Sequence, residues 1–221
     1  DGGHIAVTGV VDQHIQLAKV VEGGLHCTFA LLWVSNIQLK RQRAIWNAKF
    51  RGERPALDRR GRQVDMAALD DGVRVETILL WSALPGASRH HWGSDIDVAD
   101  GNVIARGYAP KLEVGEYRRG GPVAALSGWL GANMRRFGFY RPYTRRGRGV
   151  QPEPWHISYA PVAAPALARM SVRLLAEAIA TGGVEGEAAI LARLPSIRER
   201  YLLGVDAPPR MRSRWARLSA R

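Results

Sequence analysis

The chain has 221 residues, of which 46% are hydrophobic and 24% are charged. This length suits one domain with a substantial core, and the composition excludes a chain that is disordered throughout. The single cysteine, Cys27, excludes an intrachain disulfide bond and a zinc site built from several cysteines. The formal net charge of +12 favours anionic partners in general.

The longest apolar stretch, residues 25–34, is about half as long as a membrane-spanning helix. We therefore expect no membrane span. No secretory signal sequence is visible, although the chain starts at Asp1 and not at a methionine. The positive charge predicts weak attraction to nucleic acid at low salt, but no helix-turn-helix, zinc-finger or aromatic RNA-binding motif is recognisable, so no specific nucleic-acid partner is predicted.

The first half of the chain is predicted to hold one core strand and two helices. Residues 25–37 are apolar and partly β-branched, as in a buried strand, and residues 38–50 carry a loose helical face. Residues 51–73 are predicted to form a long surface loop. Apolar residues at helical spacing predict a second helix over 73–84, which ends at Pro85-Gly86.

The second half of the chain is predicted to alternate short strands with helices. Residues 122–137 have the strongest amphipathic pattern, because apolar side chains recur there at intervals of three and four residues before Gly138. The further predicted elements are strands over 96–98 and 155–159, a helix over 165–179, and a last helix over 187–203 that is interrupted at Pro195.

The order of these elements predicts an α+β fold. Helices and strands are interleaved, but no regular β-α-β series with glycine-rich turns is present. We expect one domain over residues 1–205, followed by a basic and poorly patterned tail over residues 206–221.

One segment, S-R-H-H-W-G-S-D-I-D at residues 88–97, combines imidazole and carboxylate groups, which together suit zinc. His90 and Asp97 are seven residues apart, so a continuous strand would place them on opposite faces of a sheet. They converge only where the chain bends between them, and Gly93 permits such a bend at low cost.

A second segment, E-P-W-H at residues 153–156, supplies a third candidate ligand, His156, and a carboxylate three residues earlier. Three protein ligands leave a fourth position for water, which is the arrangement of a catalytic zinc site. Zinc lowers the pKa of its bound water to about 7. Glu153 is then a candidate to accept the proton and to pass it to the leaving amine.

Each of these residues also has a purely structural interpretation. A single histidine is more often a hydrogen-bonded loop residue than a ligand, and Asp97 or Glu153 could cap a turn or lie at the surface. Within the first segment, His91 and Asp95 are alternative ligands. Asp95 lacks the apolar residues that flank Asp97 on both sides and would anchor it in a strand.

Taken together, the two motifs resemble those of the M15 metallopeptidases. The string S-x-H-x-x-G-x-x-x-D at Ser88, His90, Gly93 and Asp97 is followed by E-P-W-H at 153–156, and the similarity extends from near residue 30 to near residue 165. This family includes D-alanyl-D-alanine carboxypeptidases, dipeptidases linked to vancomycin resistance, and some phage endolysins.

The resemblance implies both a fold and a function. The fold is a small antiparallel sheet that carries the zinc site and is flanked by helices, the M15 peptidase or hedgehog-like fold. His90, Asp97 and His156 are the implied zinc ligands, and Glu153 is the implied catalytic base. The implied function is a zinc-dependent hydrolase of the bacterial cell envelope, periplasmic or secreted, which acts as a D-Ala-D-Ala carboxypeptidase on the stem peptides of peptidoglycan.

The residues predicted to bind substrate include one departure from the family pattern. Family members usually carry S-x-[FY]-R upstream, where the arginine binds substrate or stabilises the oxyanion, but Gln38 stands at the matching position here. Such a donor is worth about 3 kcal/mol of transition-state stabilisation, so we expect slow turnover, with Lys40 or Arg41 as the substitute cation and Arg89 as a weaker candidate. The full predicted set is Gln38, Arg41, Ser88 and Trp155.

Two other functions compete with the carboxypeptidase interpretation. One is a peptidoglycan endopeptidase of the same family, similar to an endolysin. The other is a zinc-containing module that binds the cell wall without catalysis, which the missing arginine favours and the intact Glu153 opposes. Turnover of defined peptides distinguishes the three functions.

Overall fold

The computed structural model describes residues 39–145 and 149–208. Within this part of the chain, residues 39–50 are helical. The longer helices that follow are α2 (Asp71–Leu79), α3 (Gly101–Ala105), α4 (Ala124–Asn133), α5 (Ala160–Arg169), α6 (Val172–Gly182) and α7 (Glu187–Ile197). The strands are β1 (Ala56–Leu57), β2 (Gln63–Val64), β3 (Asp95–Asp97), β4 (Phe139–Tyr140) and β5 (His156–Tyr159). The short 3-10 or π-helical turns are η1 (Met66–Ala68), η2 (Arg89–Trp92), η3 (Val114–Tyr117), η4 (Met134–Phe137) and η5 (Arg198–Leu202).

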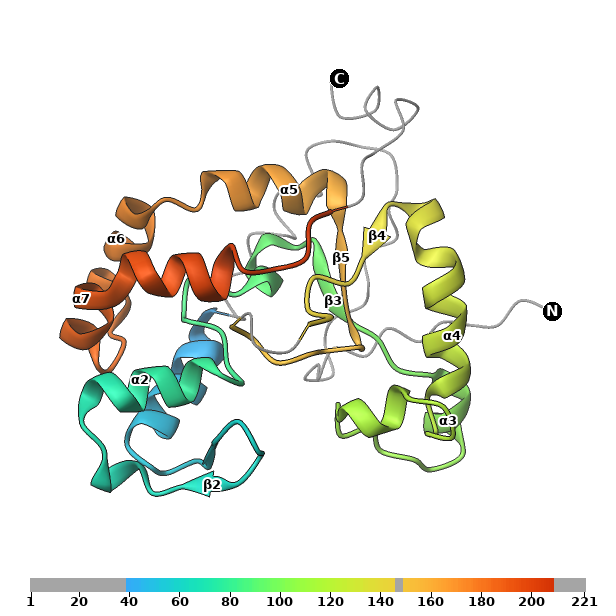
Figure 1. The fold of residues 1–221 in the computed structure, drawn as a ribbon, viewed down its shortest axis with the longest axis horizontal. Coiled ribbons are helices and arrows are strands. Elements are labelled where there is room, and N and C mark those ends of the chain that lie inside the picture. Colours follow the sequence, from blue (N-terminus) through green and yellow to red (C-terminus); the bar gives the residue numbers. More distant parts are fainter. Residues whose placement is uncertain (1–38, 146–148, 209–221) are drawn as a thin grey trace.

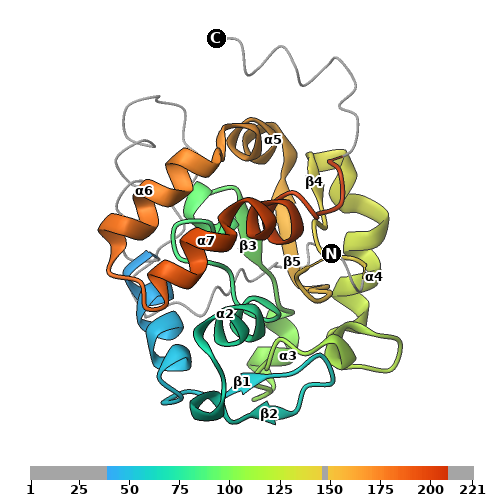
Figure 2. The same ribbon diagram turned by 60° about the vertical axis from the view of Figure 1, so that its left-hand side comes forward.

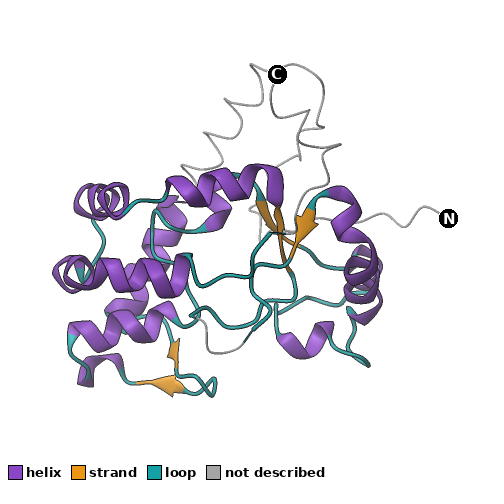
Figure 3. Ribbon diagram, turned by 45° about the horizontal axis from the view of Figure 1, so that its top comes forward, coloured by secondary structure: helices purple, strands orange, loops and turns teal. Residues whose placement is uncertain are grey.

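The central feature is a three-stranded antiparallel sheet with the strand order β3-β5-β4. Figure 1 shows this sheet between two groups of helices, with α2, α6 and α7 on one side and α3 and α4 on the other, and the turned view in Figure 2 keeps this arrangement. Figure 3 shows that helices surround a small amount of strand. The predicted α+β fold with a small antiparallel sheet is confirmed.

The larger hydrophobic core lies among the helices on the α2, α6 and α7 side. It combines Trp46, which is fully buried, with apolar side chains of these three helices, including Ile78, Ile179 and Leu194. The indole Nε1 of Trp46 donates a hydrogen bond of 3.0 Å to the Glu185 carbonyl. The predicted helix over 38–50 therefore exists over its described residues and anchors this core.

A smaller core joins the sheet to α4 and η4. Ile157 of β5 and Val98, directly after β3, pack there against Leu130 and Met134. Because successive side chains of a strand point to opposite faces, this packing leaves the other face of β3 and β5 available to polar residues. That polar face carries the candidate site.

The predicted surface loop over 51–73 is wrong in part, because it contains the β1-β2 hairpin, the turn η1 and the start of α2. The Asp58 carboxylate accepts hydrogen bonds from the backbone N–H groups of Arg60 and Arg62. Gly61 adopts a positive φ of 78° in the same turn. An aspartate that bonds to its own turn and a glycine in the left-handed region are a local hairpin signal.

The predicted helix over 165–179 is confirmed in part: its residues are helical except at Met170 and Ser171, where the chain breaks between α5 and α6. The Ser171 hydroxyl accepts a hydrogen bond from the Leu174 N–H and caps α6. Serine is strongly favoured at this position. In the last helix, α7 continues through Pro195 and changes to the π-helical turn η5 only after Ile197.

The remaining predictions differ in smaller ways. The helix over 122–137 is present as α4 and η4, but its amphipathic pattern is incomplete, because Trp129 is 45% exposed and Phe137 is 52% exposed. The strand over 155–159 is confirmed as β5, and β3 begins one residue before the predicted 96–98. The predicted strand over 25–37 and most of the predicted tail lie outside the described residues, and the described helices include none long and apolar enough to cross a membrane.

Candidate metal centre

Asp97 and His156 face each other across neighbouring strands. In the antiparallel register of β3 and β5, Asp97 pairs with His156, Ile96 with Ile157 and Asp95 with Ser158. Directly opposite residues project from the same face. The register therefore brings a carboxylate and an imidazole together, while Ile96 and Ile157 point into the core on the other face.

His90 reaches the same place because the chain bends before β3. It lies in the 3-10 turn η2, which ends at Gly93 with φ 70°, in the left-handed region. Glycine adopts this conformation without the steric cost that other residues meet. The predicted bend at Gly93 is confirmed, and it resolves the odd spacing between His90 and Asp97.

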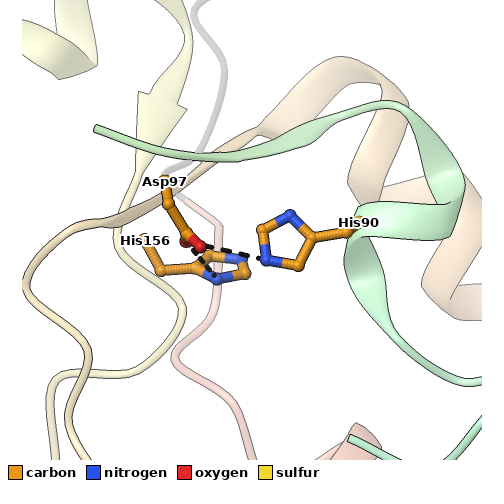
Figure 4. Close-up of side chains that lie close together, drawn as sticks. All are labelled: His90, Asp97 and His156. Atoms are coloured by element: carbon orange, nitrogen blue, oxygen red, sulfur yellow. Dashed lines mark ion pairs between the residues drawn. The ribbon is translucent and has the colours of Figure 1, made fainter. Parts of the chain in front are cut away.

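The three side chains form one cluster, shown in Figure 4. Asp97 Oδ1 lies 3.3 Å from His156 Nδ1 and 3.6 Å from His90 Nε2. One ligand atom from each residue lies within 4.8 Å of both others. Among the described residues this group contains His90 and not His91, and Asp97 and not Asp95.

The orientation of both rings is fixed by hydrogen bonds to one residue, Asp95. His156 Nε2 lies 2.9 Å from Asp95 Oδ1, and His90 Nδ1 lies 3.0 Å from the Asp95 carbonyl oxygen. The nitrogens that remain, His156 Nδ1 and His90 Nε2, are the two that face Asp97. Asp95, proposed from sequence as an alternative ligand, thus contacts the histidines from behind.

Glu153 completes the site on its more open side. Its Oε2 lies 3.2 Å from His156 Nδ1, and its side chain is 23% exposed. Asp97 and His90 are also partly exposed, at 20% and 29%, whereas His156 is 3% exposed. His156 therefore forms the buried side of the cluster, and His90, Asp97 and Glu153 form the side that solvent reaches.

The charges in this site are strongly coupled. Burial by itself lowers the pKa of His156, but the neighbouring Asp95, Asp97 and Glu153 outweigh it and raise that pKa well above 6.5. Burial raises the pKa of Asp95, whereas the hydrogen bond to His156 and the charge of Arg89 hold it well below its usual range. The pKa of Asp97 is lowered despite burial, chiefly by His156 and His90. The carboxylates of Asp95, Asp97 and Glu153 therefore carry more negative charge than a protonated His156 neutralises.

The donor set fits a metal ion on two further grounds. Asp97 Oδ1 and His156 Nδ1 are buried but form no hydrogen bond, although buried polar atoms are normally satisfied. Bonds of 2.0–2.1 Å to a tetrahedral zinc place neighbouring ligand atoms about 3.4 Å apart, close to the 3.3 Å and 3.6 Å observed. A cation between these atoms would satisfy both.

Comparison with known proteins places the chain in a family. A family model described as VanY, D-alanyl-D-alanine carboxypeptidase, matches residues 35–162, more than half of the chain. The chain belongs to the VanY family. The assignment predicted from the two motifs is confirmed, and the matched region contains all of His90, Asp97, Glu153 and His156.

Two relatives of this VanY-family chain are uncharacterized proteins of Haemophilus influenzae. One is 34% identical over 122 residues, covering 54% of this chain and 93% of the relative. The other is 49% identical over 45 residues, covering 20% of this chain and 31% of the relative. A solved structure, VanYB in complex with D-alanine-D-alanine, is 19% identical, with a TM-score of 0.37 and coverage of 63% of this chain and 70% of VanYB.

The predicted substrate-binding residues of the VanY-family chain lie in different settings. Ser88 is 5% exposed and directly precedes η2. Trp155 is 9% exposed and packs against Tyr117, with ring centroids 5.7 Å apart. Arg41 is exposed within the helix over 39–50, and Gln38 lies outside the described residues.

Arg89, the weaker candidate to replace the missing arginine, lies in the protein interior. Its side chain is 4% exposed, and its Nε donates a hydrogen bond of 2.7 Å to Asp95 Oδ1. Its burial and its bond to Asp95 favour a structural ion pair over contact with an incoming carboxylate. The role of Asp95 was the feature that sequence analysis missed, although one signal was available: Asp95 and Asp97 are two residues apart and therefore share a strand face.

Proposed function

We propose that this protein is a zinc-dependent carboxypeptidase that removes the terminal D-alanine from D-Ala-D-Ala peptides of peptidoglycan. The observation that carries the proposal is the convergence of His90 Nε2, Asp97 Oδ1 and His156 Nδ1, with Glu153 beside them. Family membership supplies the substrate class. Two imidazoles and one carboxylate favour zinc over magnesium or calcium, which prefer oxygen ligands.

In this proposal each residue has a separate task. His90, Asp97 and His156 would hold zinc, which when bound polarises the scissile carbonyl and lowers the pKa of water. Glu153 accepts the proton of the attacking water at its carboxylate and delivers it to the leaving amine. Glu153 is partly exposed, so substrate can reach it, whereas His156 is buried on the inner side of the site.

We expect one zinc ion per chain, with a stabilising effect on the fold. At a free zinc concentration 1,000 times the Kd, binding to the folded state alone adds about 4 kcal/mol to the free energy of unfolding, which raises Tm by about 10 °C for a chain of this size. Metal analysis and thermal unfolding with and without chelator measure both effects. His90→Ala should abolish the zinc-induced rise in Tm, whereas the neighbouring His91→Ala should retain it; the reverse result would reassign the ligand.

The expected substrate is a peptide with a free terminal carboxylate. We expect slow release of D-alanine from a pentapeptide that ends in D-Ala-D-Ala, because Gln38 replaces the usual arginine and a less well placed cation, Lys40 or Arg41, must orient the carboxylate. Amidation of that carboxylate should lower the rate at least tenfold. Mass spectrometry of the products measures this ratio.

The same assay separates the alternatives. Equal cleavage of the amidated peptide, or cleavage of internal bonds alone, would replace the carboxypeptidase with an endopeptidase of the same family. Zinc binding without any turnover would indicate a cell-wall-binding module. The substrate class places the proposed site of action in the bacterial cell envelope, periplasmic or secreted, with peptidoglycan stem peptides as partners.

A further inference from the structure

The strongest feature not used by the proposed reaction is the environment of the Asp95 carboxylate. Its side chain is fully buried. Oδ1 accepts a hydrogen bond from Arg89 Nε at 2.7 Å and lies 2.9 Å from His156 Nε2. Oδ2 accepts hydrogen bonds from Ser94 Oγ at 2.6 Å and from Ser158 Oγ at 3.0 Å. The contacts of Oδ1 join the carboxylate to Arg89 and His156, and those of Oδ2 join it to the two serines.

These contacts determine which nitrogen of each histidine carries a proton. An ionised carboxylate can only accept hydrogen bonds, so His156 must donate through Nε2–H. A backbone carbonyl is likewise only an acceptor, so His90 must donate through Nδ1–H to the Asp95 oxygen. With a cation bound in place of the second proton of His156, both remaining nitrogens, His156 Nδ1 and His90 Nε2, would present their lone pairs to it beside Asp97.

Arg89 offsets the cost of burying the Asp95 carboxylate at this position. A buried carboxylate is costly unless it is paired and fully hydrogen-bonded. Arg89 supplies the opposite charge, and its Nη2 also donates to Tyr140 Oη at 3.0 Å and to Ser158 Oγ at 2.7 Å. Arg89 thereby keeps Asp95 charged, and in the described part of the chain its side-chain hydrogen bonds go to Asp95, Tyr140 and Ser158 and not to either histidine.

We infer that Asp95 is a positioning residue of the metal centre: through its carboxylate and its carbonyl it sets the protonated nitrogen and the orientation of both histidines. This inference rests on the proposed zinc site. A hydrogen-bonded partner behind a ligating histidine typically contributes 10–100-fold to metal affinity. A purely structural ion pair between Arg89 and Asp95 would contribute nothing to that affinity.

The test is the zinc affinity of Asp95→Asn, measured by competition with a chromophoric chelator. Asparagine keeps the shape and one acceptor oxygen but removes the charge that faces His156 Nε2. We expect the Kd for zinc to rise 10–100-fold and the visible absorption bands of the cobalt-substituted protein to shift. Ser94→Ala is the matched control, because it removes a hydrogen bond from Oδ2 and leaves the Oδ1 side intact; its Kd should change less than threefold.

A second variant guards against a folding defect. Asp95→Asn leaves the buried Arg89 unpaired, so Arg89→Gln combined with Asp95→Asn removes both charges together and should show the same loss of affinity. A Kd within threefold of the wild type in either folded variant would overturn the inference.

The wild-type protein offers an independent measurement. In the zinc-loaded protein labelled with ¹⁵N-histidine, His156 should show a slowly exchanging Nε2–H and a Nδ1 without a proton. A metal-bound Nε2 would contradict the inference. If the wild type binds no zinc at all, the proposed function fails first, and the two failures are therefore distinguishable.

Discussion

Glu153→Gln is expected to lower kcat for a D-Ala-D-Ala-terminated peptide by about 1,000-fold, within the range for losing a general base. The amide matches the carboxylate in size but cannot accept a proton at neutral pH. The zinc content should be unchanged, because Glu153 is not one of the three clustered residues. Steady-state kinetics and metal analysis on the same preparation measure both quantities.

The control for this substitution is Glu187→Gln. Glu187 is an exposed residue in the first turn of α7 and is not part of the His90, Asp97 and His156 cluster, so the variant removes the same charge outside the site and should keep wild-type kcat. A zinc-loaded Glu153→Gln protein with wild-type turnover would show that another group serves as the base. Loss of zinc in this variant would instead make Glu153 a ligand.

Trp46→Ala is expected to reduce the free energy of unfolding by about 3–5 kcal/mol, as for other fully buried aromatic side chains. Trp46 has no exposed surface, lies in the larger core and donates a hydrogen bond to the Glu185 carbonyl. Its loss leaves a cavity between the helix over 39–50 and the α6-α7 region, and it leaves that carbonyl without its donor. Urea unfolding followed by circular dichroism measures the change.

Trp129→Ala is the matched control for the stability measurement. Trp129 also lies on a helix, but it is 45% exposed, and it stacks with Phe137 with ring centroids 6.4 Å apart. We expect its removal to cost less than about 1.5 kcal/mol, the upper range for an aromatic pair. An equal loss in both variants would contradict the expected difference between a fully buried and a half-exposed tryptophan.

Local chemistry in the sequence predicted several elements well. The helix over 39–50 and strand β5 follow from apolar spacing, and the bend at Gly93 follows from the low cost of a left-handed glycine. The break between α5 and α6 was missed because the capping signal of Ser171 competes with a continuous apolar pattern across it. The hairpin within 51–73 was missed because its strands are only two residues long, too short for an alternating pattern to be visible.

For the candidate site, too, the sequence predicted some features and left others open. The residue types and the order of S-x-H-x-x-G-x-x-x-D and E-P-W-H identified the family, which is confirmed, and named His90, Asp97 and His156 before any geometry. The roles of these residues as ligands, of Glu153 as base and of the substrate-binding residues stay predictions. The domain boundary at residue 205 stays a prediction as well.

The sequence by itself determined the family and named the candidate site residues, because residue types and motif order can be read without the fold. Only the tertiary structure decided which atoms meet. The register of β3 against β5 sets Asp97 opposite His156 and Asp95 opposite Ser158, and a shift of one residue would turn these side chains to the other face of the sheet. Register depends on hydrogen bonds between strands some 60 residues apart and on packing against α4, so the contacts that Asp95 and Arg89 make behind the histidines are visible only in the folded chain.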